Sequence, residues 1–316
     1  MVYNVNMNTI YDLVIIGGGP AGSAASVYAA RKRLKTLFIT PEWGGQSIVS
    51  EKIFNWIGTP EISGNDLAQN FKAHVLANTG DFLILEEGEK AKEILKSEAG
   101  FKVKTESGKE FETKTILITT GSSRRKLPAK NADRLEHKGL TYCASCDGPL
   151  YEGQDVVVVG GGNAAFESAA QLLAYCKSVT LINRSDTYRA DEITVEKVLK
   201  NPKMSAITGV EILEIKGEKF VDGLVYKDSK TGEQKEIKTT GVFVEIGQIP
   251  NTNFVKGLIP LNEIGKIKID AWSQKTEIPG IWAAGDCTNI LYHQNNIASG
   301  DAVRALEDIY VTIHTK

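Results

Sequence analysis

The chain has 316 residues, of which 42% are hydrophobic and 24% charged, and its formal net charge is -2. This length suits two domains of ordinary size, and the small net charge gives no electrostatic case for binding nucleic acid or an anionic membrane. No apolar run approaches the ~18 residues of a membrane-spanning helix. Residues 1–9 lack the basic and apolar regions of a secretory signal, so we expect a cytoplasmic protein.

The first recognisable unit begins at Tyr11 and reads as a buried strand, a glycine turn and an alanine-rich helix. Gly17, Gly19 and Gly22 match the G-x-G-x-x-G pattern of dinucleotide-binding proteins. In that pattern the first glycine permits the turn, the second lets a pyrophosphate approach the backbone, and the third lets helix and strand pack closely. The helix N-terminus offers unpaired N–H groups to the phosphates. A purely structural glycine turn is the less favoured interpretation.

The next strand is predicted over 36–39. Glu42 follows the glycine turn by about twenty residues, where an acid often binds a ribose 2′-hydroxyl. Pro41 and Trp43 indicate that a loop has already begun there, so Glu42 is equally well interpreted as an ordinary loop residue. Two glycines and an amide at 44–46 suit a loop lying on a large flat cofactor, and they suit a surface turn nearly as well.

Between residues 66 and 137 the pattern predicts one amphipathic helix, several strands and a linker. The predicted elements are a helix over 66–78 and strands near 82–85, 93–96, 101–105 and 114–120. A hairpin turn is expected at Ser107–Gly108. The last strand ends at Gly121, a small residue that suits the edge of the first nucleotide site. The polar stretch 122–137 is expected to be a linker.

The most informative cysteines are Cys143 and Cys146, which are followed directly by Asp147. In a reducing compartment such a pair is more often catalytic or metal-binding than structural. A structural zinc site usually takes four ligands from two close pairs, and here no second pair exists and the histidines are scattered. Redox chemistry without a metal is therefore favoured. Asp147 is the candidate acid/base, and a helix-stabilising acid is an equal alternative. Cys176 and Cys287 are interpreted as buried small apolar residues.

Residues 155–167 repeat the opening design. Gly160, Gly162 and Ala165 take the places of the three glycines, and alanine is accepted as the third residue of such fingerprints. Asn163 lies within this repeated motif. Two strand–turn–helix units in one chain predict two dinucleotide sites, which is a far stronger indication than either unit gives alone.

The strand predicted after this second loop, over 178–182, ends without an acidic residue. Arg184 and Arg189 follow it and could bind the 2′-phosphate of NADPH, which favours NADPH over NADH. Either arginine is equally well interpreted as a solvated surface charge. Near the C-terminus a further small-residue strand ends at Gly285–Asp286, where a carboxylate can accept a hydrogen bond from a cofactor hydroxyl or cap a helix. A helix is predicted over about 297–313.

Together these motifs resemble the low-molecular-weight thioredoxin reductase family over essentially the whole chain. The motifs that carry the resemblance stand at 17–22, 44–46, 143–147, 160–165 and 285–288. The segments 141–150 and 243–252 look closer to the flavoprotein subunit of alkyl hydroperoxide reductase. That relative carries an additional N-terminal thioredoxin-like disulfide module. Since about ten residues precede the first strand here, we expect a downstream disulfide to belong to another protein.

The resemblance implies an α/β fold of two Rossmann-like three-layer domains, the second inserted into the first. The implied FAD-binding domain comprises 1–118 and 248–316, and the implied NAD(P)H-binding domain is 119–247. The residues implied to bind FAD are Gly17, Gly19, Pro20, Ala21, Gly22, Gly45, Gln46, Asn55, Gly121, Gly285, Asp286, His293 and Gln294. Those implied to bind NADPH or NADH are Gly160, Gly162, Asn163, Ala165, Arg184 and Arg189. Family members are homodimers whose inserted domain rotates.

The implied activity is that of a thioredoxin-disulfide reductase. Electrons would pass from NAD(P)H through FAD and the Cys143–Cys146 pair to a thioredoxin-like or peroxiredoxin-system protein. The resemblance places Cys146 against the flavin, and the sequence does not decide which cysteine attacks the partner.

Two departures from the family pattern affect these expectations. The arginine cluster for NADPH is reduced to Arg184 and Arg189, which keeps open a reductase fed by ferredoxin or a second flavin. A flavin-binding redox sensor is the third interpretation. His293 stands where relatives usually carry Arg or Lys before Gln294; it makes flavin binding or reduction pH-dependent, or it is a neutral substitution.

Overall fold

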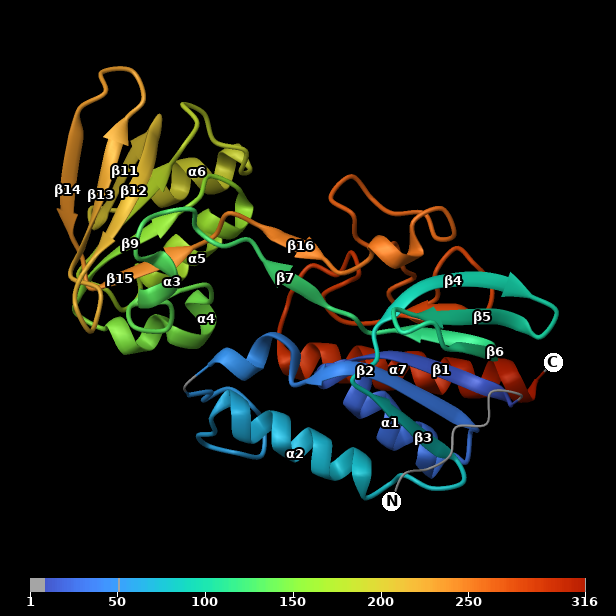
Figure 1. Cartoon of the computed structure of the whole chain (residues 1–316). Coiled ribbons are helices and arrows are strands. Elements are labelled where there is room, and N and C mark those ends of the chain that lie inside the picture. The colour runs from blue at the N-terminus through green and yellow to red at the C-terminus, as the bar shows by residue number, and fades with distance from the viewer. Residues whose placement is uncertain (1–8, 51, 316) are drawn as a thin grey trace. The chain divides into compact units, whose positions relative to one another are not determined.

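A computed structural model describes residues 9–50 and 52–315. The chain divides into two compact units, the first formed by Met1–Ser123 and Ile249–Lys316 and the second by Arg124–Gln248 (Figure 1). Each unit combines helices with a mainly parallel sheet, which confirms the predicted α/β class. All but the last of residues 1–9, on which the expectation about a secretory signal depends, lie outside the described residues.

The first unit is built on a mixed sheet that orders its strands β3-β2-β1-β6-β5-β4, with β17 also paired to β6. β1 is parallel to both β2 and β6. The strands are β1 (Ile10–Gly18), β2 (Thr36–Trp43), β3 (Leu83–Glu87), β4 (Ala91–Ser97), β5 (Gly100–Thr105), β6 (Glu110–Ile118) and β17 (Ile281–Ala283). The helical segments are α1 (Pro20–Arg31), η1 (Gly45–Val49), α2 (Gly64–Leu76), η3 (Asn253–Val255) and α7 (Asn295–His314).

The central strand β1 is buried on both faces, which explains its nearly continuous apolar sequence. Because successive side chains of a strand point to opposite faces, Leu13 and Ile15 pack toward the helices, whereas Val14 and Ile16 pack toward the layer that contains β4 and β5. The helices α1 and α7 pack on one face of the parallel strands, whereas β4 and β5, which continue the sheet from β6, fold over the other face (Figure 1). The predicted hairpin turn at Ser107–Gly108 is confirmed, since β5 and β6 pair antiparallel.

The expected loop at 41–43 is wrong, because β2 continues to Trp43. The Trp43 indole is buried and packs edge-on against Phe38, with ring centroids 5.6 Å apart. This packing holds the chain extended beyond Pro41, and the pairing of β1 with β2 shifts register to accommodate it. The side chain of Glu42 is exposed.

The second unit contains a five-stranded parallel sheet with the order β11-β10-β9-β15-β8 and an antiparallel sheet with the order β12-β13-β14. The strands are β8 (Leu140–Thr141), β9 (Asp155–Val159), β10 (Ser178–Asn183), β11 (Met204–Thr208), β12 (Val210–Lys216), β13 (Gly223–Asp228), β14 (Gln234–Lys238) and β15 (Gly241–Val244). The helical segments are α3 (Ala132–Leu135), α4 (Ala144–Asp147), η2 (Gly148–Tyr151), α5 (Asn163–Leu172) and α6 (Glu192–Leu199). Where the chain passes between the units, β7 (Ser122–Arg124) and β16 (Gln248–Pro250) pair with each other.

The core of this unit repeats the layered design of the first. Val156 and Val158 of β9 pack toward α5, where Phe166 is fully buried. The alternate residues Val157 and Val159 pack toward the antiparallel sheet. Two apolar layers therefore sandwich the parallel sheet, which is the arrangement expected for a dinucleotide-binding unit.

The expected linker over 122–137 is wrong for most of its length. Leu127 and Leu135 are buried in the second unit's core, and the backbone forms β7 and the short helix α3. These apolar anchors are separated by charged residues at irregular spacing, so no helical or strand periodicity reveals them in the sequence.

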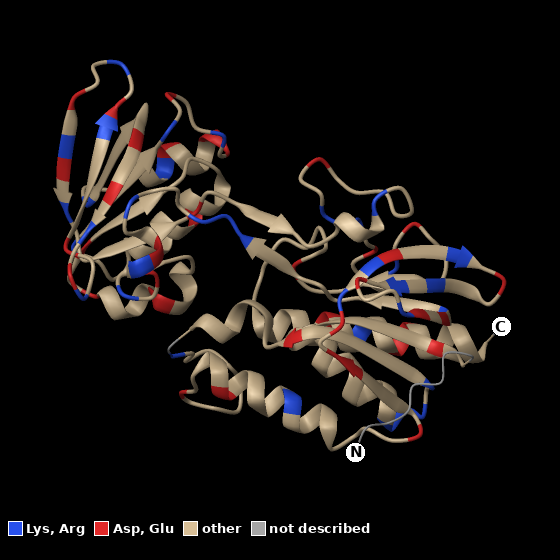
Figure 2. Cartoon of the chain, viewed as in Figure 1, with Lys and Arg blue, Asp and Glu red and all other residues tan. Residues whose placement is uncertain are grey.

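Lys and Arg residues are interspersed with Asp and Glu along the ribbon of each unit (Figure 2). Over residues 9–50 and 52–315, no helix is both long enough and apolar enough to span a bilayer.

Candidate active site: two glycine loops and a cysteine pair

The loop between β1 and α1 has the geometry that a dinucleotide-binding turn needs. Gly17 has a φ of +116°, and a Cβ there would lie 2.5 Å from the carbonyl oxygen of Thr119. A Cβ on Gly22 would lie 1.8 Å from the carbonyl oxygen of Gly17, so only glycine lets the helix approach the loop this closely. Beside Gly19 there is open space, which leaves the backbone accessible to a pyrophosphate. The helix begins at Pro20, where a missing N–H costs nothing.

Two further segments named by the sequence lie against this loop. A Cβ on Gly45 would lie 3.5 Å from the Cα of Gly19, which places η1 beside the turn. A Cβ on Gly285 would lie 3.6 Å from the Cβ of Ala21 and 3.3 Å from that of Ala298. The Gly285–Asp286 segment therefore lies between the N-terminal parts of α1 and α7.

Side-chain hydrogen bonds tie the start of α7 to the segment around η1. Asn55 donates through Nδ2 to Oε1 of Gln294 over 3.2 Å, and the Ser47 hydroxyl donates to Oδ1 of Asn295 over 2.8 Å. Gln46 precedes this serine in η1 and is exposed. The structure thus brings the predicted residues at 45–46, 55 and 294 together around one end of the sheet.

The free cysteines do not supply a thiolate to this region. Cys176 and Cys287 are both buried. Burial raises the pKa of Cys176 and raises that of Cys287 to about 11, although the backbone N–H of Gly121 opposes the shift. The same contact places Gly121, with a φ of +63°, next to the Gly285–Asp286 segment.

These residues fit an FAD molecule bound with its pyrophosphate at the N-terminus of α1. Two polar atoms, Ser23 Oγ on α1 and Asp301 Oδ2 on α7, are buried and have no hydrogen-bond partner among the described residues. Buried polar groups are normally hydrogen-bonded, so such atoms are suited to a polar ligand. The open space beside Gly19 adds access for the phosphates.

The loop after β9 in the second unit has the same glycine geometry as the loop after β1. Gly160 has a φ of +149°, and a Cβ there would lie 2.3 Å from the carbonyl oxygen of Glu245. Gly162 has open space beside it, as Gly19 does. The Ala165 methyl lies 3.0 Å from the position of such a Cβ, so alanine is accommodated because the residue it faces is glycine.

Residues after β10 support this second loop from the side. The Asn183 side chain lies so close to Gly161 that a Cβ there would be 2.5 Å from it. The backbone N–H of Arg189 donates to the carbonyl of Gly161 over 2.7 Å, and Asn163 accepts a backbone hydrogen bond from the start of α6. The side chains of Arg184 and Arg189 are exposed. Both arginines follow β10 in the chain. In folds of this kind, a 2′-phosphate binds after this strand.

Cys143 and Cys146 form a disulfide. Cys143 is the N-cap residue of the short helix α4, and its sulfur accepts the backbone N–H of Cys146 over 3.1 Å. A sulfur at a helix N-terminus is stabilised as a thiolate by backbone N–H groups. The sequence predicted that this pair can open and close a disulfide ring, and the structure contains the closed form.

Asp147 lies directly after the second cysteine and is largely shielded from solvent. It accepts a hydrogen bond from the Thr141 hydroxyl. Burial raises the pKa of Asp147, against the opposing effects of Thr141, His137 and Arg124. A carboxyl group with a raised pKa retains a proton closer to neutral pH, which suits a group that exchanges protons with sulfur.

Two ionisable residues near the glycine loops were not identified from the sequence. Glu245 follows β15 and accepts a hydrogen bond from the Ser168 hydroxyl over 2.7 Å; burial raises its pKa to about 7. An acid at the carboxyl end of a buried strand was a usable signal. Lys266 is 7% exposed, and its Nζ lies 2.9 Å from Nε2 of His293. No motif marks this lysine.

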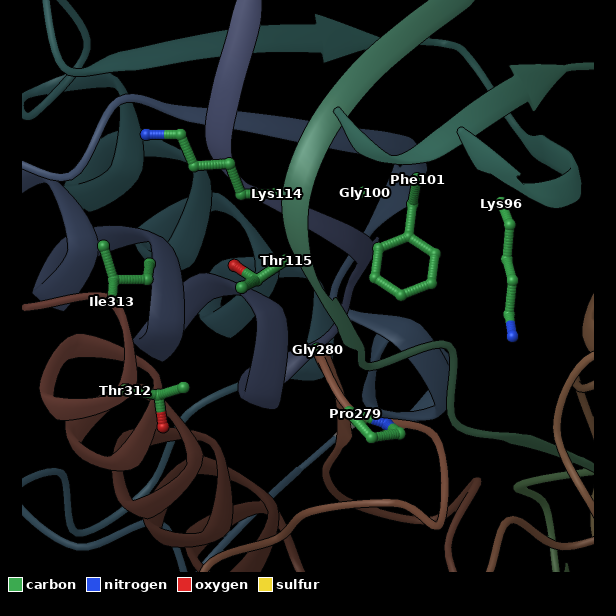
Figure 3. Close-up of a pocket in the computed structure, with 9 residues that line it drawn as sticks. All are labelled: Lys96, Gly100, Phe101, Lys114, Thr115, Pro279, Gly280, Thr312 and Ile313. Atoms are coloured by element: carbon green, nitrogen blue, oxygen red, sulfur yellow. The ribbon is translucent and has the colours of Figure 1, made fainter. Parts of the chain in front are cut away.

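A separate hollow of the first unit lies at the other end of the sheet (Figure 3). Its lining includes Lys114 at the middle of β6, Gly280 just before β17 and Thr312 at the end of α7. None of the predicted site residues lines it. Ligands bind at the carboxyl ends of strands in open α/β sheets, so this hollow is not the predicted nucleotide site. Within the part of the chain that the structure describes, no cluster of three or more His, Cys, Asp or Glu could hold a metal.

Two glycine-loop units, one of which carries a closely spaced cysteine pair, are typical of the pyridine nucleotide-disulfide class of oxidoreductases. The family model for pyridine nucleotide-disulphide oxidoreductases matches residues 11–303. The chain therefore belongs to that family.

Solved thioredoxin reductases resemble the chain over almost its full length. The enzyme from Streptococcus pyogenes MGAS5005 is 33% identical, with a TM-score of 0.89 and coverage of 98% of this chain and 100% of that one. The enzyme from Giardia duodenalis is 30% identical, with a TM-score of 0.91 and coverage of 96% and 100%. The resemblance predicted from the motifs is confirmed.

Curated relatives include longer proteins. An NADH dehydrogenase from Bacillus subtilis (strain 168) is 35% identical over 295 residues, which are 93% of this chain and 57% of that protein. A subunit of the alkyl hydroperoxide reductase of Escherichia coli (strain K12) is 36% identical over 305 residues, which are 95% and 58% of the two chains. The chain thus spans less than two thirds of the length of these relatives.

Proposed function

We propose that the protein is an FAD-dependent thioredoxin-disulfide reductase that takes electrons from NAD(P)H and delivers them to a disulfide of another protein. The observation that carries the proposal is the Cys143–Cys146 disulfide at the start of α4. It stands in the same unit as the glycine loop at Gly160–Gly162 and has the shielded Asp147 beside it. A structural disulfide needs neither an adjacent acid of raised pKa nor a nucleotide loop.

The two cofactors are assigned to the two units. FAD is proposed to bind to 1–118 and 248–316, with its pyrophosphate at the Gly17–Gly22 loop and its remaining polar groups held by residues of the 45–46, 55, 121, 285–286 and 293–294 segments. NAD(P)H is proposed to bind to 119–247 at the Gly160–Ala165 loop. Supporting this assignment, both middle glycines have open space where a phosphate approaches.

When bound, FAD supplies a two-electron relay between the nicotinamide and the cysteine disulfide. The chain's own contribution is sulfur chemistry. Opening the Cys143–Cys146 bond takes up two electrons and two protons and gives two thiols. One thiolate then attacks the partner's disulfide and forms a mixed disulfide, which the other cysteine resolves. The partner leaves as a dithiol, and the Cys143–Cys146 bond forms again.

Asp147 is proposed to hold and return the proton that this cycle moves at sulfur. The Thr141 hydroxyl fixes the carboxylate by a hydrogen bond. Cys146 and Asp147 are adjacent in α4, so a proton could pass between them directly or through one water.

NADPH is proposed as the preferred donor over NADH. Arg184 and Arg189 are exposed on the segment after β10. Both are therefore available to a 2′-phosphate. Further parts of the proposal are a thioredoxin-like or peroxiredoxin-system partner, a homodimer and a cytoplasmic location. The similarity to thioredoxin reductases and to a subunit of alkyl hydroperoxide reductase supports them.

The test is an anaerobic titration of the flavin-loaded protein with NADPH and, separately, with NADH. Bleaching of the flavin absorption band is expected with a lower half-saturating concentration for NADPH. Reduction by neither nucleotide would refute the donor and favour ferredoxin or a second flavin. The variants Cys143→Ser and Cys146→Ser should bleach normally and lose thioredoxin reduction. Turnover retained by both variants would refute the dithiol mechanism, and slow thioredoxin reduction by the wild type would favour a sensor.

A further inference from the structure

In the first unit, the side chains of Lys266, His293 and Asp286 lie in a row, each close to the next. Lys266 is buried, with 7% of its surface exposed, and its Nζ lies 2.9 Å from Nε2 of His293. Nδ1 of the same imidazole lies 3.3 Å from Oδ1 of Asp286; it is buried and has no aligned hydrogen-bond partner within residues 9–50 and 52–315. A lysine is almost never this buried unless another group requires its charge.

The backbone holds Lys266 in place beside the Gly285–Asp286 segment. Oδ1 of Asn262 accepts the backbone N–H of Lys266 over 2.8 Å, and the Thr252 hydroxyl donates to the carbonyl of Gly265 over 2.6 Å. The next residue, Ile267, donates its N–H to the carbonyl of Cys287 over 2.9 Å. The turn that carries Lys266 is therefore fastened directly to the segment that carries Asp286.

The atoms that can donate and accept hydrogen bonds determine where the protons of Lys266 and His293 lie. A charged lysine can only donate, so Nε2 of His293 must accept, and the ring proton lies on Nδ1, which faces the Asp286 carboxylate. In this arrangement the ammonium group of Lys266 supplies one positive charge, the imidazole is neutral, and Asp286 supplies one negative charge. The titratable groups that face Lys266 are His293, Asp286 and Cys287.

The electrostatic balance of Lys266 is consistent with this assignment. Burial lowers the pKa of Lys266, and the charge of Asp286 opposes that change. The carboxylate of Asp286 therefore favours the protonated form of the lysine. Conversely, the lysine offsets a carboxylate that would otherwise stand uncompensated beside the Gly285 segment.

We propose that Lys266 is a positioning residue of the flavin site, which orients His293, neutralises Asp286 and thereby raises the reduction potential of the bound flavin. The inference rests on the proposed binding of FAD by the first unit. Two-electron reduction with uptake of one proton adds a negative charge to the flavin. A nearby cation therefore stabilises the reduced form more than the oxidised form, whereas an unbalanced carboxylate has the opposite effect.

The first measurement is the midpoint potential of the flavin at pH 7, by spectroelectrochemical titration of the FAD-loaded protein. In Lys266→Met the ratio of reduced to oxidised flavin at a given potential should fall about tenfold, which corresponds to about 30 mV for a two-electron couple. Lys266→Arg retains the charge and should stay near the wild-type potential. The matched control is Lys268→Met, because Lys268 is two residues away and exposed; it should leave the potential unchanged.

The second measurement reads the histidine directly and needs no flavin. The chain has four histidines, so ¹⁵N-labelled imidazoles give few signals, and His293→Asn identifies the one of interest. The wild type should show the Nδ1–H tautomer, and Lys266→Met should gain the Nε2–H form. An unchanged tautomer and an unchanged potential in Lys266→Met would overturn the inference. A wild type that binds no FAD would overturn the proposed function as well, and the titration detects that separately.

Discussion

Glu245 provides the sharpest test of the second unit, because its carboxyl group is shielded and its backbone lies beside Gly160 of the second glycine loop. Burial raises its pKa from 4.5 to about 7, with a smaller raising effect of Glu167, while Ser168 and Arg124 lower it. A carboxyl group with a raised folded-state pKa stabilises the fold fully below the unfolded value and loses that contribution as pH rises through the folded value. Deprotonation between about pH 4.5 and pH 7 should therefore destabilise the protein.

The magnitude follows from about 1.36 kcal/mol per pKa unit. A shift of roughly 2.5 units costs at most about 3 kcal/mol above pH 7, and less where solvent screens the carboxylate. The variant Glu245→Gln keeps an oxygen for the Ser168 hydrogen bond and removes the charge. It should therefore be more stable than the wild type by up to about 3 kcal/mol at pH 8 and by under about 1 kcal/mol at pH 5.

The assay is urea unfolding followed by far-ultraviolet circular dichroism at both pH values. All four tryptophans belong to the first unit, at positions 43, 56, 272 and 282, so tryptophan fluorescence reports that unit separately. Glu167→Gln is the matched control, since Glu167 is exposed on α5 next to Ser168, and it should show little dependence of its effect on pH. A stability gain of Glu245→Gln that is equal at pH 5 and pH 8 would refute the reasoning.

Three further predictions concern the loops and the cysteine pair. Gly22→Ala should fail to fold or lose several kcal/mol of unfolding free energy, because its Cβ would collide with the backbone. Gly19→Ala should fold normally and bind FAD at least tenfold more weakly. Equal thermal stability of the two variants would contradict this prediction. Thr141→Val removes a hydrogen bond that lowers the pKa of Asp147, so the pH profile of disulfide reduction should move to higher pH, and an unmoved profile would exclude Asp147 as the proton carrier. Arg184→Met should weaken NADPH binding about tenfold in calorimetry, as for loss of one charged hydrogen bond, and leave NADH binding unchanged; an equal loss for both would place this arginine away from the 2′-phosphate.

The features that the sequence predicted well are those written in contiguous residues. Each glycine loop follows a run of apolar residues and precedes a helix, so the strand, the turn and the helix are all encoded within about thirty positions. The Cys143–Cys146 pair is local in the same way, and its spacing alone permits the disulfide that the structure contains. The geometry of such local motifs can be predicted because it depends on residues that are adjacent in the sequence.

The features that the sequence missed depend on tertiary packing. Trp43 keeps β2 extended through Pro41 because Phe38 and a buried environment hold its indole. Leu127 anchors a polar stretch to the second unit's core, and no periodicity reveals it. Lys266 and His293 are 27 residues apart, in irregular segments, so only the folded chain shows that they meet.

Lys266 and Glu245, which the sequence did not reveal, place opposite charges beside the two glycine loops: a cation near the first and an acid near the second. Beside the first unit's Gly285 segment, Lys266 compensates the carboxylate of Asp286 through His293. Beside the second unit's loop, burial raises the pKa of Glu245 to about 7, so its carboxyl group is mostly neutral only below that pH. A pyrophosphate bound as proposed at the N-terminus of α5 is anionic, so ionised Glu245 would oppose it. Rising pH should therefore weaken nucleotide binding at the second loop, while the charge that balances the first loop persists until Lys266 loses its proton.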